Sequence, residues 1–232
     1  MSDKAGELEK LVGRTIRLNE PLAEHTLLKL PVFAEYYFET DAQDLLIKAI
    51  SAARSLNLPI YILGSGARVS AEKNIKGLVI KNLCRRFDKA SVKGSIKKNE
   101  VGVEYVQVYA QAGVLMNQLV RFTIEEGLSG LEYQLGLPGT VGGAIFTNAK
   151  YKPKYLPVNK SLQSVTLLNE TGDVQTYNGE VPYFVFTDED WHESKDIILS
   201  AVFKLMPADK KVLWERAEEA VKWRNENGKK EK

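Results

Sequence analysis

The chain has 232 residues, of which 44% are hydrophobic and 27% charged, so its composition is that of a globular protein and not of a disordered one. A net charge of only +2 gives no support to nucleic-acid binding. One cysteine, Cys84, and two histidines, His25 and His192, argue against an internal disulfide or a Cys- or His-rich metal site. No apolar run approaches the roughly 18 residues of a membrane helix, and the polar first ten residues are unlike a secretory signal. We therefore expect a cytoplasmic protein that binds no metal, membrane or nucleic acid.

The first part of the chain, residues 1–83, shows the order strand, helix, strand, glycine loop, strand. A short polar helix or arm precedes this unit. Apolar residues recur at helical spacing behind Thr40 and Gln43, which have the spacing of a capping box. The elements expected here are a strand at 34–39, a helix at 45–56 and strands at 59–63 and 77–81.

A second unit is expected at 84–206. Its polar, basic start at 84–100 indicates either a boundary or a solvated hairpin. A helix should end at Gly127, and Asn169–Asp173 should form the turn of a hairpin. Residues 207–232 should form a final helix, N-capped by Asp209, and a tail. The other elements expected are strands at 101–110, 162–168, 174–177 and 197–205 and a helix bearing Leu115, Leu119 and Phe122.

A glycine loop follows the strand at 59–63, with the sequence Gly64-Ser65-Gly66-Ala67-Arg68. Successive backbone N–H groups in such a loop can form a concave nest for phosphate oxygens, and Arg68 could add a charge-assisted contact. The loop is not a Walker loop, because no Gly-Lys-Ser/Thr follows, and it is not a complete GxGxxG dinucleotide fingerprint. The alternative is a tight turn between two strands.

A second segment, residues 136–144, has Gly or Pro at five of nine positions. Ordering each glycine costs roughly 0.5–1 kcal/mol, so packing alone rarely requires so many. A ligand or another backbone segment should therefore lie very close, although a compact crossover loop is an alternative. Two nests of phosphate size indicate a pyrophosphate and hence a dinucleotide cofactor.

Five stretches of the chain carry a further signal, namely PLAEHTLLKL at 21–30, LPIYILGSGA at 58–67, KGLVIKNL at 76–83, AQAGV at 110–114 and GLSGLEYQLGLPGTVGGAIFTNA at 127–149. In these stretches the chain resembles the UDP-N-acetylenolpyruvoylglucosamine reductase family, and the resemblance covers residues 20–224. The resemblance implies an α+β fold of the PCMH-type FAD-binding class, with two subdomains and FAD between them. In that family a hydride passes from NADPH to FAD and then to the enolpyruvyl double bond of a UDP-sugar.

The same resemblance implies which residues contact FAD. They are Gly64, Ser65, Gly66, Ala67 and Arg68 in the first loop, Leu137, Pro138, Gly139, Thr140, Gly142 and Gly143 in the second, and Gly113 and Asn148 outside them.

Catalytic features of that family have no counterpart in this sequence. The family's tyrosine–arginine pair falls at 181–188, where Tyr183 is present but no arginine. Its third domain, which supplies a protonating serine and a supporting glutamate, would begin where the sequence stops at Lys232. The family's Asn-Ala-Gly-Ala-Tyr-Gly segment is replaced by Asn-Ala-Lys-Tyr-Lys-Pro at 148–153.

Three functions are therefore compared. The first is an FAD-binding relative of the reductase without its full catalytic set. The second is an active NADPH- and FAD-dependent oxidoreductase that is completed by a partner chain or uses another substrate. The third is a structural or interaction protein without flavin. We favour the first, because the missing catalytic residues argue against the second and the retained glycine loops argue against the third.

Overall fold

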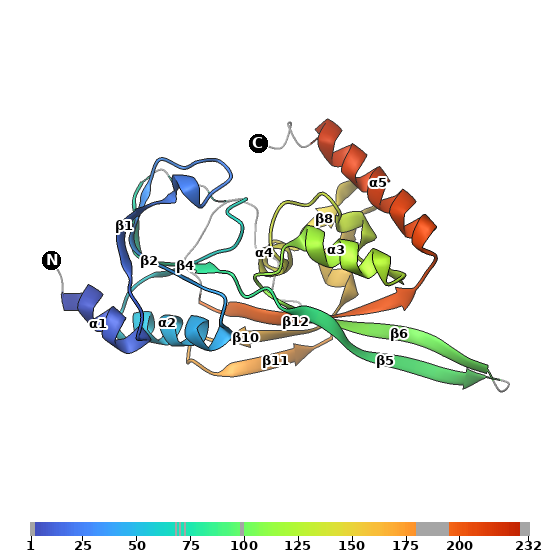
Figure 1. The fold of residues 1–232 in the computed structure, drawn as a ribbon, viewed down its shortest axis with the longest axis horizontal. Helices are drawn as coiled ribbons and strands as arrows, with labels where there is room; N and C mark the ends of the chain where they lie inside the picture. The colour runs from blue at the N-terminus through green and yellow to red at the C-terminus, as the bar shows by residue number, and fades with distance from the viewer. Residues whose placement is uncertain are drawn as a thin grey trace.

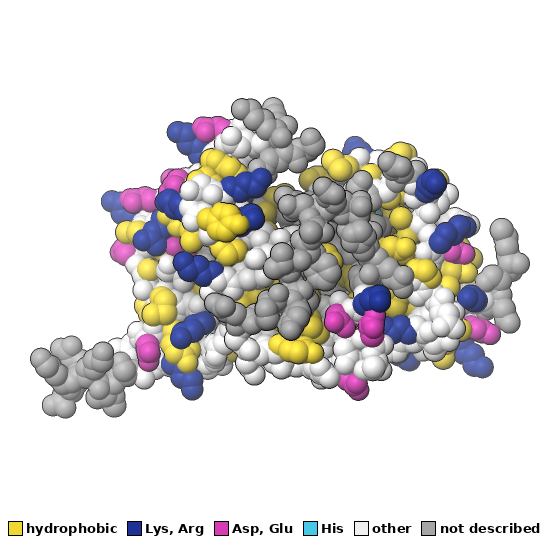
Figure 2. Space-filling view, turned by 180° about the vertical axis from the view of Figure 1, so that it is seen from behind, with side chains coloured by type: hydrophobic (Ala, Val, Ile, Leu, Met, Phe, Trp, Pro, Cys, Tyr) yellow, Lys and Arg dark blue, Asp and Glu magenta, His cyan; other side chains and the backbone are white. Residues whose placement is uncertain are grey.

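The computed structural model describes residues 3–67, 69, 71, 73–97, 100–179 and 195–227. Two sheets lie beside one another, each with helices on one face (Figure 1). Basic and acidic side chains are interspersed among the described residues on the face shown in Figure 2.

The first sheet has the strand order β1-β2-β4-β3. Strands β2, β4 and β3 are parallel, and β1 pairs antiparallel with β2. Side chains alternate between the two faces of each strand, so one face packs on the helices α1 and α2 and the other on the segment that follows β1. The bounds are α1 Asp3–Val12, β1 Arg17–Pro21, β2 Phe33–Thr40, α2 Gln43–Ser55, β3 Ile60–Leu63 and β4 Ile75–Asn82.

The second sheet is antiparallel, in the order β11-β10-β12-β6-β5. Helices α3 and α5 cover its inner face, and the β5–β6 hairpin projects from the body (Figure 1). The bounds are β5 Phe87–Lys97, β6 Glu100–Gln111, α3 Met116–Glu125, β10 Leu162–Leu168, β11 Val174–Asn178, β12 Ile197–Pro207 and α5 Lys210–Asn227.

Short elements fill the connection between α3 and β10. They are the strands β7 Leu128–Ser129, β8 Lys150–Tyr151 and β9 Leu156–Pro157, the six-residue helix α4 Val141–Phe146, and the 3₁₀ turns η2 Glu132–Gln134, η3 Lys152–Lys154 and η4 Val158–Ser161. A further 3₁₀ turn, η1 Leu22–Glu24, follows β1. None of the helices in the described ranges is both long and apolar enough to span a bilayer.

Most predicted elements are confirmed, including the hairpin at 162–178 and the N-cap of α5. The Asp209 carboxylate accepts hydrogen bonds from the N–H groups of Lys211 (2.9 Å) and Val212 (3.2 Å). The stretch at 84–100 is largely a hairpin strand. Gly127 follows α3 with φ +68°, as a glycine that ends a helix does.

The predicted capping box is wrong. Thr40 is the last residue of β2, and its hydroxyl accepts the N–H of Ala42 at 3.1 Å within the turn. Ala42 is the residue at the N-cap position of α2, and no side chain caps that helix. The Thr40 hydroxyl therefore stabilises the turn before α2 and does not act as the N-cap of that helix.

The two sheets share apolar packing. Leu168, Ile197 and Leu199 of the second sheet belong to the same buried cluster as the inner side chains of α1, α2 and the first sheet. The division of the chain into one subdomain at 1–83 and a second at 84–206 stays a prediction.

Candidate functional site

The two predicted glycine loops meet at the carboxyl end of the parallel strands. Gly64 directly follows β3, and a Cβ atom built on it would lie 2.6 Å from Thr140 Oγ1 of the second loop. No side chain larger than hydrogen fits there. Two segments that are 76 residues apart in the chain at Gly64 and Thr140 are thus in contact.

The second loop is also tied to residues 112–116, which follow β6. Val141 N–H donates to the Val114 carbonyl and Gly142 N–H to the Ala112 carbonyl, both at 2.8 Å. Met116 N–H donates to the carbonyl of Gly139 at 3.0 Å. These backbone bonds fix the loop against the second sheet.

Gly113 joins this junction to the first sheet. A Cβ on Gly113 would lie 2.6 Å from the Cys84 carbonyl oxygen and 2.8 Å from that of Asn82, the last residue of β4. The junction therefore combines the ends of β3 and β4, the segment after β6 and the second loop.

The predicted glycines fall into two groups. Gly64, Gly66, Gly113 and Gly142 lie so close to other parts of the protein that a Cβ on any of them would come within 3.0 Å of another atom. Gly139 and Gly143 differ. Among the described residues, a Cβ on Gly139 meets nothing within 4 Å, and one on Gly143 meets only Thr140 Oγ1, at 3.6 Å. The first group serves contact between protein segments, whereas the described residues leave space beside the second group.

Thr140 fixes the start of α4. Its side-chain oxygen accepts the N–H of Gly143 at 3.4 Å, and its backbone carbonyl accepts the N–H of Ala144 at 2.8 Å. Because the same side chain also lies against Gly64, Thr140 links the start of this helix to the first glycine loop.

Two of the predicted residues, Ser65 and Asn148, carry buried oxygen atoms, Oγ and Oδ1, that find no hydrogen-bond partner among the residues that the structure describes. Buried polar atoms are nearly always hydrogen-bonded, so these two are ready for a bound group. Asn148 also has a left-handed backbone, with φ +43°. Hydroxyl and N–H groups of a dinucleotide could satisfy both atoms, so the residues present fit FAD. Asn159 Oδ1 and Gln163 Oε1 are likewise buried and unpartnered.

The other predicted residues lie beside these. Ala67 continues the first loop, and Leu137 and Pro138 lead into the second, where Leu137 packs on the main core. Arg68 lies outside the described residues, as does the stretch 181–188 that contains Tyr183.

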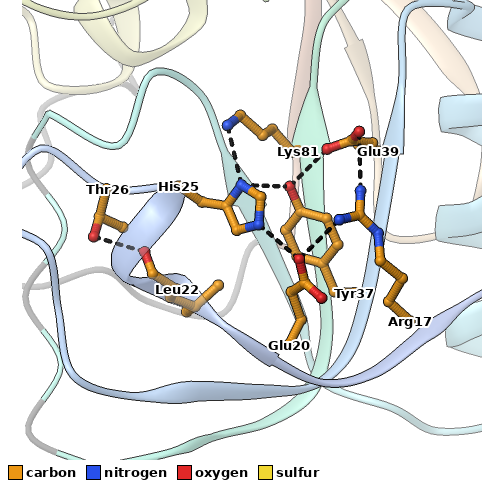
Figure 3. Close-up of polar contacts among 8 residues, drawn as sticks. All are labelled: Arg17, Glu20, Leu22, His25, Thr26, Tyr37, Glu39 and Lys81. Atoms are coloured by element: carbon orange, nitrogen blue, oxygen red, sulfur yellow. Dashed lines mark hydrogen bonds and ion pairs between the residues drawn. The ribbon is translucent and has the colours of Figure 1, made fainter.

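A polar network beside the first loop was not predicted as part of the site (Figure 3). His25 Nε2 lies 2.8 Å from Glu20 Oε1, and its Nδ1 lies 3.3 Å from Lys81 Nζ and 3.2 Å from the Tyr37 hydroxyl. The His25 ring also stacks on Tyr37, with 4.5 Å between ring centroids. Burial, followed by the hydrogen bond to Glu39, raises the pKa of Tyr37 well above its usual range.

The network holds the segment against which the first loop packs. A Cβ on Gly66 would lie 2.3 Å from the His25 carbonyl oxygen, and Leu27 N–H donates to the Gly66 carbonyl at 2.9 Å. Thr26 Oγ1 donates to the Leu22 carbonyl at 2.9 Å, which closes the turn. Residues 21–26 (PLAEHT) thus pack against the first glycine loop and hold it in place.

Comparisons with known proteins agree with this geometry. The family described as FAD binding domain matches residues 34–178. The UDP-N-acetylenolpyruvoylglucosamine reductase of Carboxydothermus hydrogenoformans is 29% identical over 92% of this chain and 66% of its own length. The reductase of the same name from Lactobacillus delbrueckii subsp. bulgaricus is 32% identical over 87% of this chain and 63% of its own length. The chain thus spans 63–66% of the length of these two relatives.

Solved structures share the fold. The reductase from Thermus caldophilus covers 90% of this chain and 70% of that chain, with a TM-score of 0.66 and 23% identity. A variant of Phl p 4 described as a glucose oxidase covers 90% of this chain and 45% of that chain, with a TM-score of 0.59 and 16% identity. The predicted α+β fold of the PCMH type and the predicted resemblance are confirmed. The chain belongs to the FAD-binding domain family, and its cofactor is FAD.

Proposed function

We propose that this chain is a flavoprotein related to the UDP-N-acetylenolpyruvoylglucosamine reductases that holds FAD between the loops 64–67 and 137–143 and does not carry out the whole reductase reaction by itself. The observation that carries the proposal is the contact between Gly64 and Thr140, next to the open positions Gly139 and Gly143. The proposal includes a cytoplasmic location, supported by the UDP-linked sugar in the relatives' name.

In this proposal the protein binds and orients, and bound FAD supplies the capacity for hydride transfer. Backbone N–H groups of the first loop bind the diphosphate, as in other nests of successive amides. The Ser65 hydroxyl and the Asn148 amide oxygen, which have no partner in the described part of the chain, bond to polar groups of the cofactor. Thr140 keeps the second loop against the first.

The sequence differs from the family in the residues that would bind the substrate. A guanidinium binds a carboxylate in two-pronged geometry, which other side chains do not reproduce. Residues 181–188, where the resemblance puts such an arginine, contain none. We therefore propose that NADPH and a UDP-sugar are not converted at ordinary rates by this chain alone.

Two measurements on the purified chain test the proposal. We expect a flavin absorption spectrum after incubation with FAD, and a rise in melting temperature that corresponds to about 2.7 kcal/mol at 100 times the Kd. With NADPH and the enolpyruvyl derivative of UDP-N-acetylglucosamine, we expect no turnover under conditions in which the reductase from Carboxydothermus hydrogenoformans is active. A colourless protein without an FAD-dependent shift would contradict FAD binding. Turnover similar to that of the relative would contradict the second half of the proposal and favour a complete oxidoreductase.

A further inference from the structure

Lys81 lies in β4 beside the strand end that carries the first glycine loop. It is the second-last residue of β4 and pairs in register with Leu63 of β3. Gly64 comes directly after Leu63, and the carbonyl of Asn82, directly after Lys81, lies against Gly113. Lys81 therefore pairs with the residue before Gly64 and directly precedes the residue whose carbonyl lies against Gly113.

The Lys81 side chain lies on the face of the first sheet that carries the first loop. Side chains alternate along a strand, so Lys81 shares a face with Val79. Val79 belongs to a buried cluster with Leu22, Tyr37 and Val69, whereas Leu78 and Ile80 face the helices α1 and α2. The segment around η1 and the chain that continues from the first glycine loop lie on this side of the sheet.

His25 orients the ammonium group of Lys81 without neutralising it (Figure 3). A lysine ammonium can only donate, so His25 Nδ1 at 3.3 Å accepts its hydrogen bond. His25 Nε2 then carries the proton and donates to Glu20 Oε1 at 2.8 Å. In this arrangement His25 offers Lys81 a hydrogen-bond acceptor and no negative charge.

The two carboxylates of this network are held by another cation. Arg17 contacts Glu20 Oε1 at 2.8 Å and Glu39 Oε1 at 2.9 Å, and the Tyr37 hydroxyl donates to Glu39 Oε2 at 2.9 Å. In the ranges that the structure describes, no carboxylate lies within ion-pair distance of Lys81. A partly buried cation without a counter-ion is costly, so an anion at this position would be stabilising.

We propose that Lys81, oriented by His25, binds the diphosphate of FAD and supplies the positive charge of the cofactor site. This inference rests on the proposed function, which puts the diphosphate at the loop 64–67. Charge-assisted hydrogen bonds from an ammonium to phosphate oxygens are among the stronger polar contacts in proteins. The backbone N–H groups of the loop orient the diphosphate, and the ammonium group of Lys81 compensates its negative charge.

The test measures the Kd for FAD of the apoprotein and of its variants at low and at moderate salt. Lys81→Met removes the charge and keeps the length of the side chain. Its matched control is Lys76→Met, since Lys76 is exposed at the other end of β4. We expect Lys81→Met to raise the Kd about 10-fold to 100-fold and to weaken its dependence on salt. Lys81→Arg should retain most of the affinity, and Lys76→Met all of it.

The outcomes separate this inference from the proposed function. An unchanged Kd in Lys81→Met would overturn the role of Lys81 while the unmodified chain still bound FAD. A raised Kd with the salt dependence of the unmodified chain would also overturn it, because Lys81 would then act only on the shape of the loop. Failure of the unmodified chain to bind FAD would instead contradict the proposed function.

Discussion

The two sides of the candidate FAD site differ in the charge of their side chains. The side formed by the first sheet contains the charged residues Arg17, Glu20 and Lys81, which lie in one network around His25. The opposite side, residues 112–116 and 137–148, contains no charged side chain at all. It is held by backbone hydrogen bonds and by Thr140. In this account one side recognises the charge of the cofactor and the other recognises its shape.

The glycines show a second contrast, between positions that face protein and positions that face open space. A side chain at a closed position should destabilise the fold, whereas one at an open position should affect only the cofactor. Stability and FAD affinity can therefore be measured separately, and each change below is expected to move mainly one of them.

The largest effect is expected for Gly66→Ala. The new Cβ would lie 2.3 Å from the His25 carbonyl oxygen, in a backbone with φ +71°. We expect a loss of about 3 kcal/mol in the free energy of unfolding, measured with urea in the absence of FAD. The control is Gly172→Ala, which has φ +91° but nothing within 4 Å and should lose about 1 kcal/mol. Equal losses in the two variants would show that the contact with His25 is unimportant.

Arg216→Met should lower stability without changing FAD affinity. Arg216 contacts Glu132 Oε1 at 3.0 Å, and the side chain of Glu132 is only 4% exposed. The carboxylate keeps hydrogen bonds from Ser129 and from Gly130 N–H, so we expect a loss of about 1–3 kcal/mol. The exposed Lys211 on the same helix provides the control Lys211→Met. A large change in the Kd for FAD would mean that this ion pair shapes the cofactor site.

Gly143→Leu should weaken FAD binding without lowering the stability of the apoprotein. A Cβ at Gly143 meets only Thr140 Oγ1, at 3.6 Å, and leucine is a better helix former than glycine. We expect an unchanged or higher melting temperature of the apoprotein and a Kd for FAD at least 10-fold higher, roughly the effect of 1.4 kcal/mol. Gly142→Leu is the matched contrast, because its Cβ would lie 2.9 Å from that of Ala112 and should lower stability. Unchanged affinity in Gly143→Leu would place the cofactor elsewhere.

The smallest effect is expected for Asn148→Gly. Glycine accepts the left-handed backbone at φ +43° without strain and removes the unpartnered amide oxygen. Stability should stay the same or rise, and the Kd for FAD should rise about 3-fold to 10-fold. Asn57→Gly changes another left-handed asparagine, after α2, and should leave the Kd unchanged. If both variants bound FAD like the unmodified chain, Asn148 would not be a ligand.

Periodicity predicted most of the fold because most of its strands and helices bury one regular apolar face. It missed β1, whose five residues RLNEP are mostly exposed at a sheet edge. It also missed α4, because VGGAIF is short and rich in glycine, and the helix depends on the cap by Thr140. Both elements are stabilised by their neighbours and not by their own sequence.

The candidate site was predictable only in part. The glycine loops are visible in the sequence, but their contact depends on the parallel pairing of β3 with β4 and on the bonds from 139–142 to 112–116. The network around His25 joins Glu20, Tyr37 and Lys81, which are up to 61 residues apart in the chain. No local pattern marks such a set, because only the folded sheet brings its members together.

The central claim is that both loops together bind a diphosphate. It is tested most directly by titrating the apoprotein with FAD and, separately, with riboflavin, which has the same ring system but no diphosphate. The account predicts saturable binding of one FAD per chain, at least about 100-fold tighter than that of riboflavin. Equal affinity for the two compounds, or no binding of FAD, would contradict it.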